Sequence, residues 1–274
     1  MDQSDEKKIS WTGMTHKGRF RKNNEDAFLA LSIHSNQVSY LGRIGSSTFE
    51  KNEFVFAVSD GMGGAKSGEF ASKVAVDKIT KMVPNYFNLN PEILENKAPE
   101  LLKNIMLQTH QEMHKLGRSY EECFGMGATL SLCWFTRDLL ILSHVGDSRI
   151  YKLPQGGGIH QISKDHTHAG WLHREGKINE REARQHPEAN HLQQVLGGKT
   201  DKPNPQTEVF DYQKGDKYLL CSDGIVDGIW NHNLETIIRE PSERFKGLDP
   251  SQRLVKEALE ESGRDNLTAL VIEF

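Results

Sequence analysis

Short apolar runs, each bounded by glycine, aspartate or asparagine, set the strongest limit on how this chain can fold. They cover residues 54–58, 139–142, 218–220 and 267–274. Runs this short between turn-forming residues are typical of strands buried in a sheet. Residues 127–135 predict another strand, which Arg137 and Asp138 would turn into the run at 139–142 as a hairpin, and residues 150–153 continue this meander.

Three segments repeat apolar residues at the three- and four-residue spacing of an amphipathic helix. They lie within residues 70–82, 101–116 and 254–259, and the last is opened by Asp249-Pro250 and closed by Gly263. Hairpin runs interrupted by helices indicate an α+β fold with antiparallel sheets rather than alternating βαβ units. We therefore expect two sheets stacked face to face, with helices outside.

Two segments differ from this pattern. Residues 169–202 are polar and contain Gly176, Pro187 and Gly197-Gly198, so we expect a surface subdomain inserted between core strands. Residues 35–52, with two glycines and paired serines, predict a long loop or a hairpin excursion.

The composition does not indicate a nucleic-acid or membrane partner. The chain has 274 residues, a net charge of −4 and a pI near 6.3, which suits one large domain or two small ones. A weakly acidic chain has no general attraction to nucleic acid or to anionic membranes. No apolar stretch approaches the roughly 20 residues that span a bilayer, and the polar start MDQSDEKKIS argues against a signal peptide.

Cysteine usage points to a reducing compartment. Three cysteines form no C-x-x-C pair, and Cys133 and Cys221 lie inside apolar runs, which favours buried thiols. The odd count gives no disulfide framework, and structural disulfides are rare in the cytosol. We expect a cytoplasmic protein.

Five aspartates stand where the core strands begin or end. Asp60, Asp147 and Asp223 follow apolar runs, whereas Asp26 and Asp265 precede them. A single Asp-Gly pair is most often only a turn. Five acids in the same relation to buried strands instead predict carboxylates that converge at the rim of a sheet.

Converging carboxylates repel one another and are costly to desolvate unless a cation neutralises them. Hard oxygen ligands select Mg²⁺, Mn²⁺ or Ca²⁺ over zinc. Two such ions can bind a phosphoryl oxygen and activate a water as the nucleophile. Gly61 could offer its carbonyl as a further ligand. Arg21, four residues before Glu25, could take a phosphate bidentately, although a solvated surface arginine is the alternative.

These residues resemble the type 2C metal-dependent serine/threonine protein phosphatases in their compact bacterial form. The resemblance covers nearly the whole chain and keeps the family's motif order. The matching motifs are RKNNEDA at 21–27, VSDGMGG at 58–64, GATL at 127–130 with VGDSRIY at 145–151, ISKDHT at 162–167, LCSDG at 220–224, and DNLT at 265–268.

The resemblance implies a single domain over 1–274 that folds as a four-layer αββα sandwich. It implies Asp26, Asp60, Asp223 and Asp265 as acids of a binuclear Mn²⁺ or Mg²⁺ centre, with the Gly61 carbonyl and with Glu25 at the second ion. Asp147 would hold a third, weaker ion together with Asp223. Arg21 would bind phosphate, and residues 169–202 would form a mobile flap beside the site.

The activity that the resemblance implies is hydrolysis of phosphoserine and phosphothreonine on proteins by metal-activated water. The expected partners are phosphoproteins, in particular the substrates of a serine/threonine kinase, and the chain would act as a monomer without binding nucleic acid or membrane. One alternative is a catalytically silent domain that binds phosphoproteins. Another is a phosphatase acting on a regulator of a sigma factor.

One position departs from the family pattern. Animal members carry a histidine two residues after the aspartate of the second motif, whereas Met62 stands here. The leaving hydroxyl must then take its proton from water or from another side chain. His166 is a candidate, with a structural loop histidine as the favoured alternative. Five histidines between 166 and 191 show no familiar zinc spacing, and a pH-sensing role for them is a hypothesis.

Overall fold

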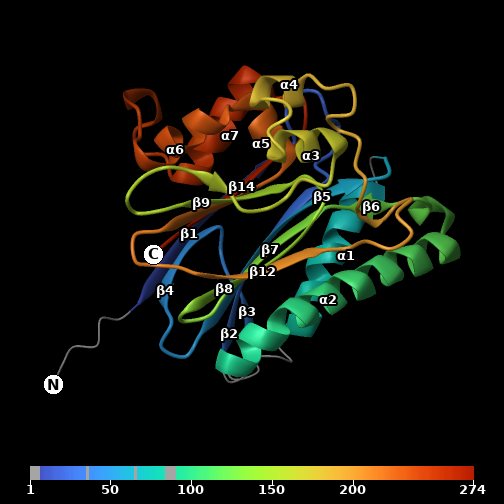
Figure 1. Ribbon diagram of the computed structural model, residues 1–274, viewed down its shortest axis with the longest axis horizontal. Helices are drawn as coiled ribbons and strands as arrows, with labels where there is room; N and C mark the ends of the chain where they lie inside the picture. Colours follow the sequence, from blue (N-terminus) through green and yellow to red (C-terminus); the bar gives the residue numbers. More distant parts are fainter. Residues whose placement is uncertain (1–6, 35–36, 65–66, 84–90) are drawn as a thin grey trace.

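The computed structural model describes residues 7–34, 37–64, 67–83 and 91–274, without the side chains of 91–95. Two antiparallel sheets lie face to face between two layers of helices (Figure 1). This arrangement confirms the sandwich expected from the sequence. No helix in the described part of the chain is long and apolar enough to cross a membrane.

The first sheet has the strand order β10-β9-β13-β14-β1-β4. Its strands are β10 (His160–Gln161), β9 (Arg149–Leu153), β13 (Lys217–Cys221), β14 (Leu267–Glu273), β1 (Lys8–His16) and β4 (Ile44–Thr48). The last strand of the chain, β14, lies between β13 and the first strand, β1.

The second sheet has the order β11-β6-β5-β7-β8-β12, and β2 and β3 extend it beside β5. Its strands are β11 (Leu196–Gly197), β6 (Gly127–Ala128), β5 (Glu53–Met62), β7 (Leu130–Phe135), β8 (Leu139–Val145), β12 (Gln206–Asp211), β2 (Asp26–His34) and β3 (Gln37–Tyr40). The predicted hairpin at 137–138 connects β7 to β8.

Helices cover the outer face of each sheet. α1 (Ser67–Met82) and α2 (Pro91–Ser119) pack on the second sheet, whereas α5 (Asp223–Gly228), α6 (Asn231–Arg239) and α7 (Pro250–Glu261) pack on the first. Short 3₁₀ turns lie at η2 (Glu121–Cys123) and η3 (Glu243–Phe245). Asp249 caps α7 in a capping box with proline at the start, so the predicted start of this helix is confirmed.

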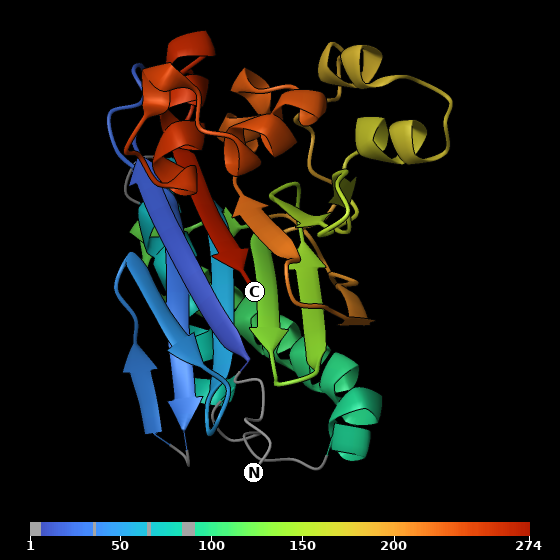
Figure 2. The ribbon, with the colours of Figure 1, turned by 90° about the vertical axis from the view of Figure 1, so that its left-hand side faces the viewer.

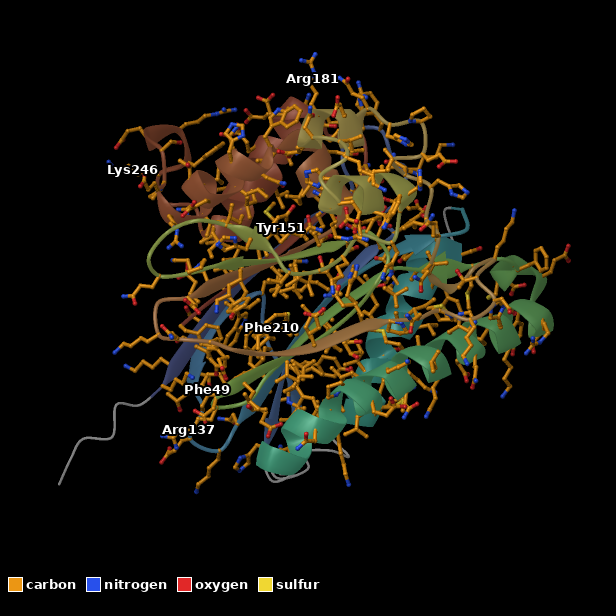
Figure 3. The ribbon with its side chains drawn as sticks, viewed as in Figure 1. Phe49, Arg137, Tyr151, Arg181, Phe210 and Lys246 are labelled. Atoms are coloured by element: carbon orange, nitrogen blue, oxygen red, sulfur yellow. The ribbon has the colours of Figure 1, made fainter. Side chains whose placement is uncertain are left out.

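Three apolar clusters hold the layers together. One joins α1 and α2 to the second sheet, another fills the space between the sheets, and the last joins α5–α7 to the first sheet. Tyr151, labelled in Figure 3, belongs to the last cluster, and its hydroxyl donates to Asn231 Oδ1 at 2.9 Å. All three cysteines are free and buried, which confirms the prediction made for Cys133 and Cys221.

Two inserted segments contain more regular secondary structure than the sequence predicted. Residues 37–48 do not form a hairpin with each other: β3 pairs with β2 in the second sheet, and β4 pairs with β1 in the first, so the segment crosses between the sheets. Residues 35 and 36 lie outside the described residues. The polar segment contains two short helices, α3 (His168–Arg174) and α4 (Glu180–Arg184), which stand beyond the ends of the sheets (Figure 2).

Candidate functional site

The aspartates singled out in the sequence gather at one end of the two sheets. Asp26, the first residue of β2, lies opposite Asp60 in the register of β2 with β5. Asp223 follows β13 and opens α5, and Asp265 stands two residues before β14. An open cleft of about 480 Å³ at this end is lined by five of the predicted acids and by the predicted arginine: Glu25, Asp60, Asp147, Asp223, Asp265 and Arg21.

Asp26 is buried with one carboxylate oxygen satisfied and the other bare. Its Oδ2 accepts hydrogen bonds from Ser222 Oγ at 2.7 Å and from Thr268 Oγ1 at 2.6 Å. Its Oδ1 is also buried and has no hydrogen-bond partner among the described residues. Burial raises the pKa of Asp26 to about 6, although the two hydroxyl donors oppose the rise.

Asp60 and Asp223 stand in an environment that is still less favourable to negative charge. Burial, followed by the charges of Asp26 and Asp223, raises the pKa of Asp60 well above its ordinary value. Burial and then Asp147 do the same to the pKa of Asp223. The Oδ1 atom of Asp223 is buried and lacks a partner within the described part of the chain. These carboxylates therefore need either protons or a nearby cation.

Two glycines let the second sheet and α1 approach each other beside Glu25. A Cβ built on Gly61 would lie 1.9 Å from the carbonyl oxygen of Gly68, and one on Gly68 would lie 2.2 Å from Glu25 Oε2. Any larger residue would close this space, so the Gly61 carbonyl and the Glu25 carboxylate are neighbours only because both positions are glycine. Burial, more than any neighbouring charge, raises the pKa of Glu25.

Arg21 and Asp265 pair at the mouth of the cleft. A guanidinium nitrogen of Arg21 donates to Asp265 Oδ2, and this hydrogen bond is the main reason that the pKa of Arg21 is raised. The Arg21 side chain is 52% exposed, so it can turn from Asp265 toward a ligand in the cleft. Asp265 Oδ1 is held by the backbone N–H of Asn266 at 2.8 Å.

Asp147 lies at the side of the cleft and also faces a narrower cavity beside Asp223. Burial, then the charge of Asp165, raises the pKa of Asp147 to about 7, whereas Arg149 lowers it. Arg149 and Asp165 are joined by two-pronged hydrogen bonds, from Nε to Oδ2 at 2.9 Å and from Nη2 to Oδ2 at 2.8 Å, with Nε also 3.2 Å from Oδ1. This ion pair forms one wall of the narrower cavity.

The structure favours a structural role for His166. Its Nδ1 accepts from the Gly146 N–H at 3.1 Å, and its backbone N–H donates to the Gly146 carbonyl at 2.8 Å. Burial lowers its pKa to about 4, so the ring is neutral at neutral pH and is a poor general acid. His166 is absent from the lining of the cleft, whereas Met62 is part of it.

The donor chemistry of the cleft suits hard divalent cations. As placed, no three His, Cys, Asp or Glu side chains of the described residues form a group that would hold a metal ion. Asp265 is turned to Arg21, and one oxygen of Asp26 is turned to two hydroxyls. The bare, buried oxygens of Asp26 and Asp223 and the mutual repulsion of the acids are what a cation would relieve.

The residues that hold the acids in place were not predicted. Asn266 accepts the Glu25 N–H at 2.7 Å and donates to the carbonyls of Lys17 and Asn23 at 2.9 Å each, so it ties the loop before β2 to the start of β14. Thr129 accepts the Asp60 N–H at 2.9 Å. Both residues lie inside motifs noted in the sequence, and that position is the only signal that could have found them.

Comparison with known proteins identifies the family of this chain. A family model described as protein phosphatase 2C matches residues 43–262. A serine/threonine phosphatase of Listeria welshimeri named stp is 30% identical over 266 residues, which cover 94% of this chain and 93% of the relative.

Solved structures show the same fold. The serine/threonine phosphatase PstP/Ppp of Mycobacterium tuberculosis has 27% identity, a TM-score of 0.74 and coverage of 97% of this chain and 99% of its own. A catalytic domain of PstP with 26% identity and a TM-score of 0.71, covering 97% of this chain and 98% of its own, is described in complex with two manganese ions. From these matches, the chain belongs to the protein phosphatase 2C family.

Proposed function

We propose that this protein hydrolyses phosphoserine and phosphothreonine on proteins at a centre of two Mn²⁺ or Mg²⁺ ions. The observation that carries the proposal is the group of mutually repelling carboxylates that gathers at an open cleft, of which Asp26 and Asp223 each keep a buried oxygen without a hydrogen-bond partner among the described residues. A protein that only bound phosphate would gain nothing from concentrating negative charge there. Retention of every acid also argues against the catalytically silent alternative.

The proposed metal ligands are Asp26, Asp60, Asp223 and Asp265, the Gly61 carbonyl and Glu25, with a third, weaker ion between Asp147 and Asp223. When bound, the ions supply a Lewis acid for phosphoryl oxygens and lower the pKa of water. The antiparallel pairing of Asp26 with Asp60 orients the first two carboxylates toward the same point. Met62 carries no proton for the leaving hydroxyl, so another group or water must donate it.

Arg21 is proposed to bind the substrate phosphate. Its guanidinium is half exposed, lines the cleft and pairs with Asp265. Turning to a phosphate would free Asp265 for the metal centre, so substrate capture and completion of the ligand set would occur together. A planar guanidinium suits bidentate contact with two phosphoryl oxygens.

We also propose that residues 169–202 act as a flap within a single domain over 1–274. Asn190 and Leu192 of this segment line the cleft, which supports contact between the flap and a bound substrate. The free, buried thiols agree with a cytoplasmic location. There, the substrates would be phosphoproteins made by a serine/threonine kinase, and the protein would act as a monomer.

Hydrolysis of a small aryl phosphate and of phosphoserine, phosphothreonine and phosphotyrosine peptides tests the proposal. We expect turnover with Mn²⁺, loss of turnover with a chelator, and recovery when Mn²⁺ is restored. Binding of phosphopeptides without any metal-dependent turnover would instead identify a silent binding domain. Preference for phosphotyrosine over the other two peptides would overturn the proposed substrate class.

A further inference from the structure

A second hollow lies on the other side of β11 from the catalytic cleft. It is a groove of about 970 Å³ between the C-terminal half of α2 and residues 198–203, and it shares no lining residue with the cleft. Its charged and ionisable lining consists of His110, His114, Arg118, Lys199, Asp201 and Lys202. Three of these side chains are always cationic at neutral pH and one is anionic.

Two histidines one helical turn apart on α2 hold the wall of this groove in place. His110 Nδ1 accepts the Gly197 N–H at 3.0 Å, so the ring proton sits on Nε2 and donates to the Asp201 carbonyl at 3.1 Å. His114 Nε2 lies 3.3 Å from the Thr200 carbonyl. Because both nitrogens of His110 are occupied by backbone groups, the pair is a structural clamp rather than a metal site.

The cations of the groove have no protein partner. Arg118, Lys199 and Lys202 are exposed and make no hydrogen bond or ion pair with another described residue. Many other arginines of the described chain are neutralised by a carboxylate, as Arg149 is by Asp165 and Arg184 by Glu180. Three free cations around one hollow, held by a clamped loop, form a surface complementary to anions.

The groove is close enough to the cleft for one extended peptide to reach both. β6 lies between β11 and β5, with Leu196 opposite Ala128 and Ala128 opposite Gly61. Two strand spacings put β11, which leads directly into the groove at Gly198, about 10 Å from the end of β5, or roughly three residues of extended chain. A phosphorylated residue in the cleft would therefore place side chains about three to six positions away over the groove.

We propose that this groove binds an acidic stretch of the phosphoprotein substrate, beside the residue that is dephosphorylated. The inference rests on the proposed phosphatase activity and deepens it by naming the substrate class. The anionic group can be the carboxylate of Asp or Glu or a second phosphoryl group, since both accept hydrogen bonds from Arg and Lys. The attraction between the groove and the peptide is electrostatic and acts between exposed charges, so binding weakens as salt is added.

The test compares a groove variant, Arg118→Gln/Lys199→Gln/Lys202→Gln, with the native chain in the presence of Mn²⁺. The substrates are an aryl phosphate and three phosphothreonine peptides of equal length. The residues on both sides of the phosphothreonine are alanine in the first peptide and glutamate in the second. In the third they are a non-hydrolysable phosphonate analogue of phosphoserine. We expect the groove variant to lose about tenfold in kcat/KM on the anionic peptides, since exposed ion pairs each contribute a few-fold.

A matched control variant, Lys8→Gln/Arg43→Gln/Lys256→Gln, removes the same number of exposed cations from β1, the β3–β4 connection and α7. It should keep the native preference for anionic flanks, and both variants should keep native turnover of the aryl phosphate and the alanine peptide. The glutamate and phosphonate arms separate the two sources of negative charge.

Four outcomes would overturn the inference: no preference of the native chain for anionic flanks, an unchanged preference in the groove variant, an equal loss in the control variant, or an equal loss on the alanine peptide. Failure of the native chain to turn over the aryl phosphate would instead overturn the proposed function. Thermal unfolding of both variants shows whether they fold, and their substituted side chains are exposed.

Discussion

At the scale of single residues, the carboxylates that the reaction needs also destabilise the metal-free protein. Burial and then neighbouring carboxylates raise the pKa of Asp26, Asp60 and Asp223, so negative charge at each position is less favourable when no metal is bound. Groups placed for function at the cost of stability are common in active sites. Replacing one of these aspartates by asparagine should therefore separate its contribution to catalysis from its effect on stability.

Asp60→Asn should abolish metal-dependent turnover and raise the melting temperature of the metal-free protein. The amide keeps the shape of the side chain but removes a repelling charge and a metal ligand. Turnover of an aryl phosphate and thermal unfolding in chelator measure the two effects. Asp211→Asn, at an exposed residue on β12, is the control and should change neither. An active Asp60→Asn enzyme would remove Asp60 from the proposed ligand set.

Arg21→Ala should chiefly raise the KM for an aryl phosphate and lower kcat much less. The expected rise is about tenfold or more, because a charged hydrogen bond to phosphate is worth roughly 1.5–3 kcal/mol. Steady-state kinetics with Mn²⁺ over a range of substrate concentration measures both constants. An effect confined to kcat would contradict the assigned role of Arg21.

At the scale of elements, the close contact of β5 with the start of α1 positions the site. Gly61→Ala should destabilise the protein by about 1–3 kcal/mol or prevent folding, since a Cβ there would lie 1.9 Å from the Gly68 carbonyl oxygen. Chemical denaturation measures the change. Gly156→Ala is the matched control, because a Cβ on Gly156 meets no atom within 4 Å. Equal stability of the two variants would show that α1 can move away from β5 freely.

The elements that the sequence predicted are those with a strong local pattern. Apolar runs marked β5, β8, β13 and β14, and helical spacing marked α1, α2 and α7. The flap helices are only seven and five residues long, too short for periodicity to show. α4 did carry a readable signal, the capping box of Asn179 with Glu182. α6 begins with three polar residues after Trp230 and lacked any comparable signal.

The candidate site was predictable as a set of residues but not as an arrangement. The aspartates stood out because each adjoins a core run. Their hydroxyl and amide partners did not, because Ser222 and Thr268 reach Asp26 from about 200 residues or more along the chain. The groove on α2 was also hidden, since its cations come from two segments that the packing of α2 against β11 brings together.

At the scale of the whole molecule, the buried acids make stability depend on pH. The pKa values of Asp26 and Asp147 are raised in the folded chain to about 6 and about 7, against about 3.9 when unfolded. Between about pH 4 and 7 the folded state thus holds protons that the unfolded state releases. The contribution of these two groups to the free energy of unfolding is fully present below about pH 4 and is lost as the pH rises through about 6 and 7.

The melting temperature of the chelated protein should therefore fall between pH 5 and 8, with each unit of pKa difference worth about 1.4 kcal/mol. Saturating Mn²⁺ should raise the melting temperature and flatten or reverse this slope, since bound cations favour the charged carboxylates. Thermal unfolding across this range with chelator and with Mn²⁺ measures both slopes. Asp26→Asn should show a shallower slope in chelator, and a slope unchanged by both Mn²⁺ and Asp26→Asn would contradict the explanation.

The place of β14 has a consequence for how the enzyme is made. This strand joins β1 to β13, and its leading loop carries Asp265 and Asn266. Until β14 has been synthesised, the first sheet remains in two parts, and Asp26 and Glu25 lack their hydrogen-bond partners Thr268 and Asn266. A nascent chain that has not reached β14 therefore lacks part of the site, so we expect phosphatase activity only from chains in which β14 has been made.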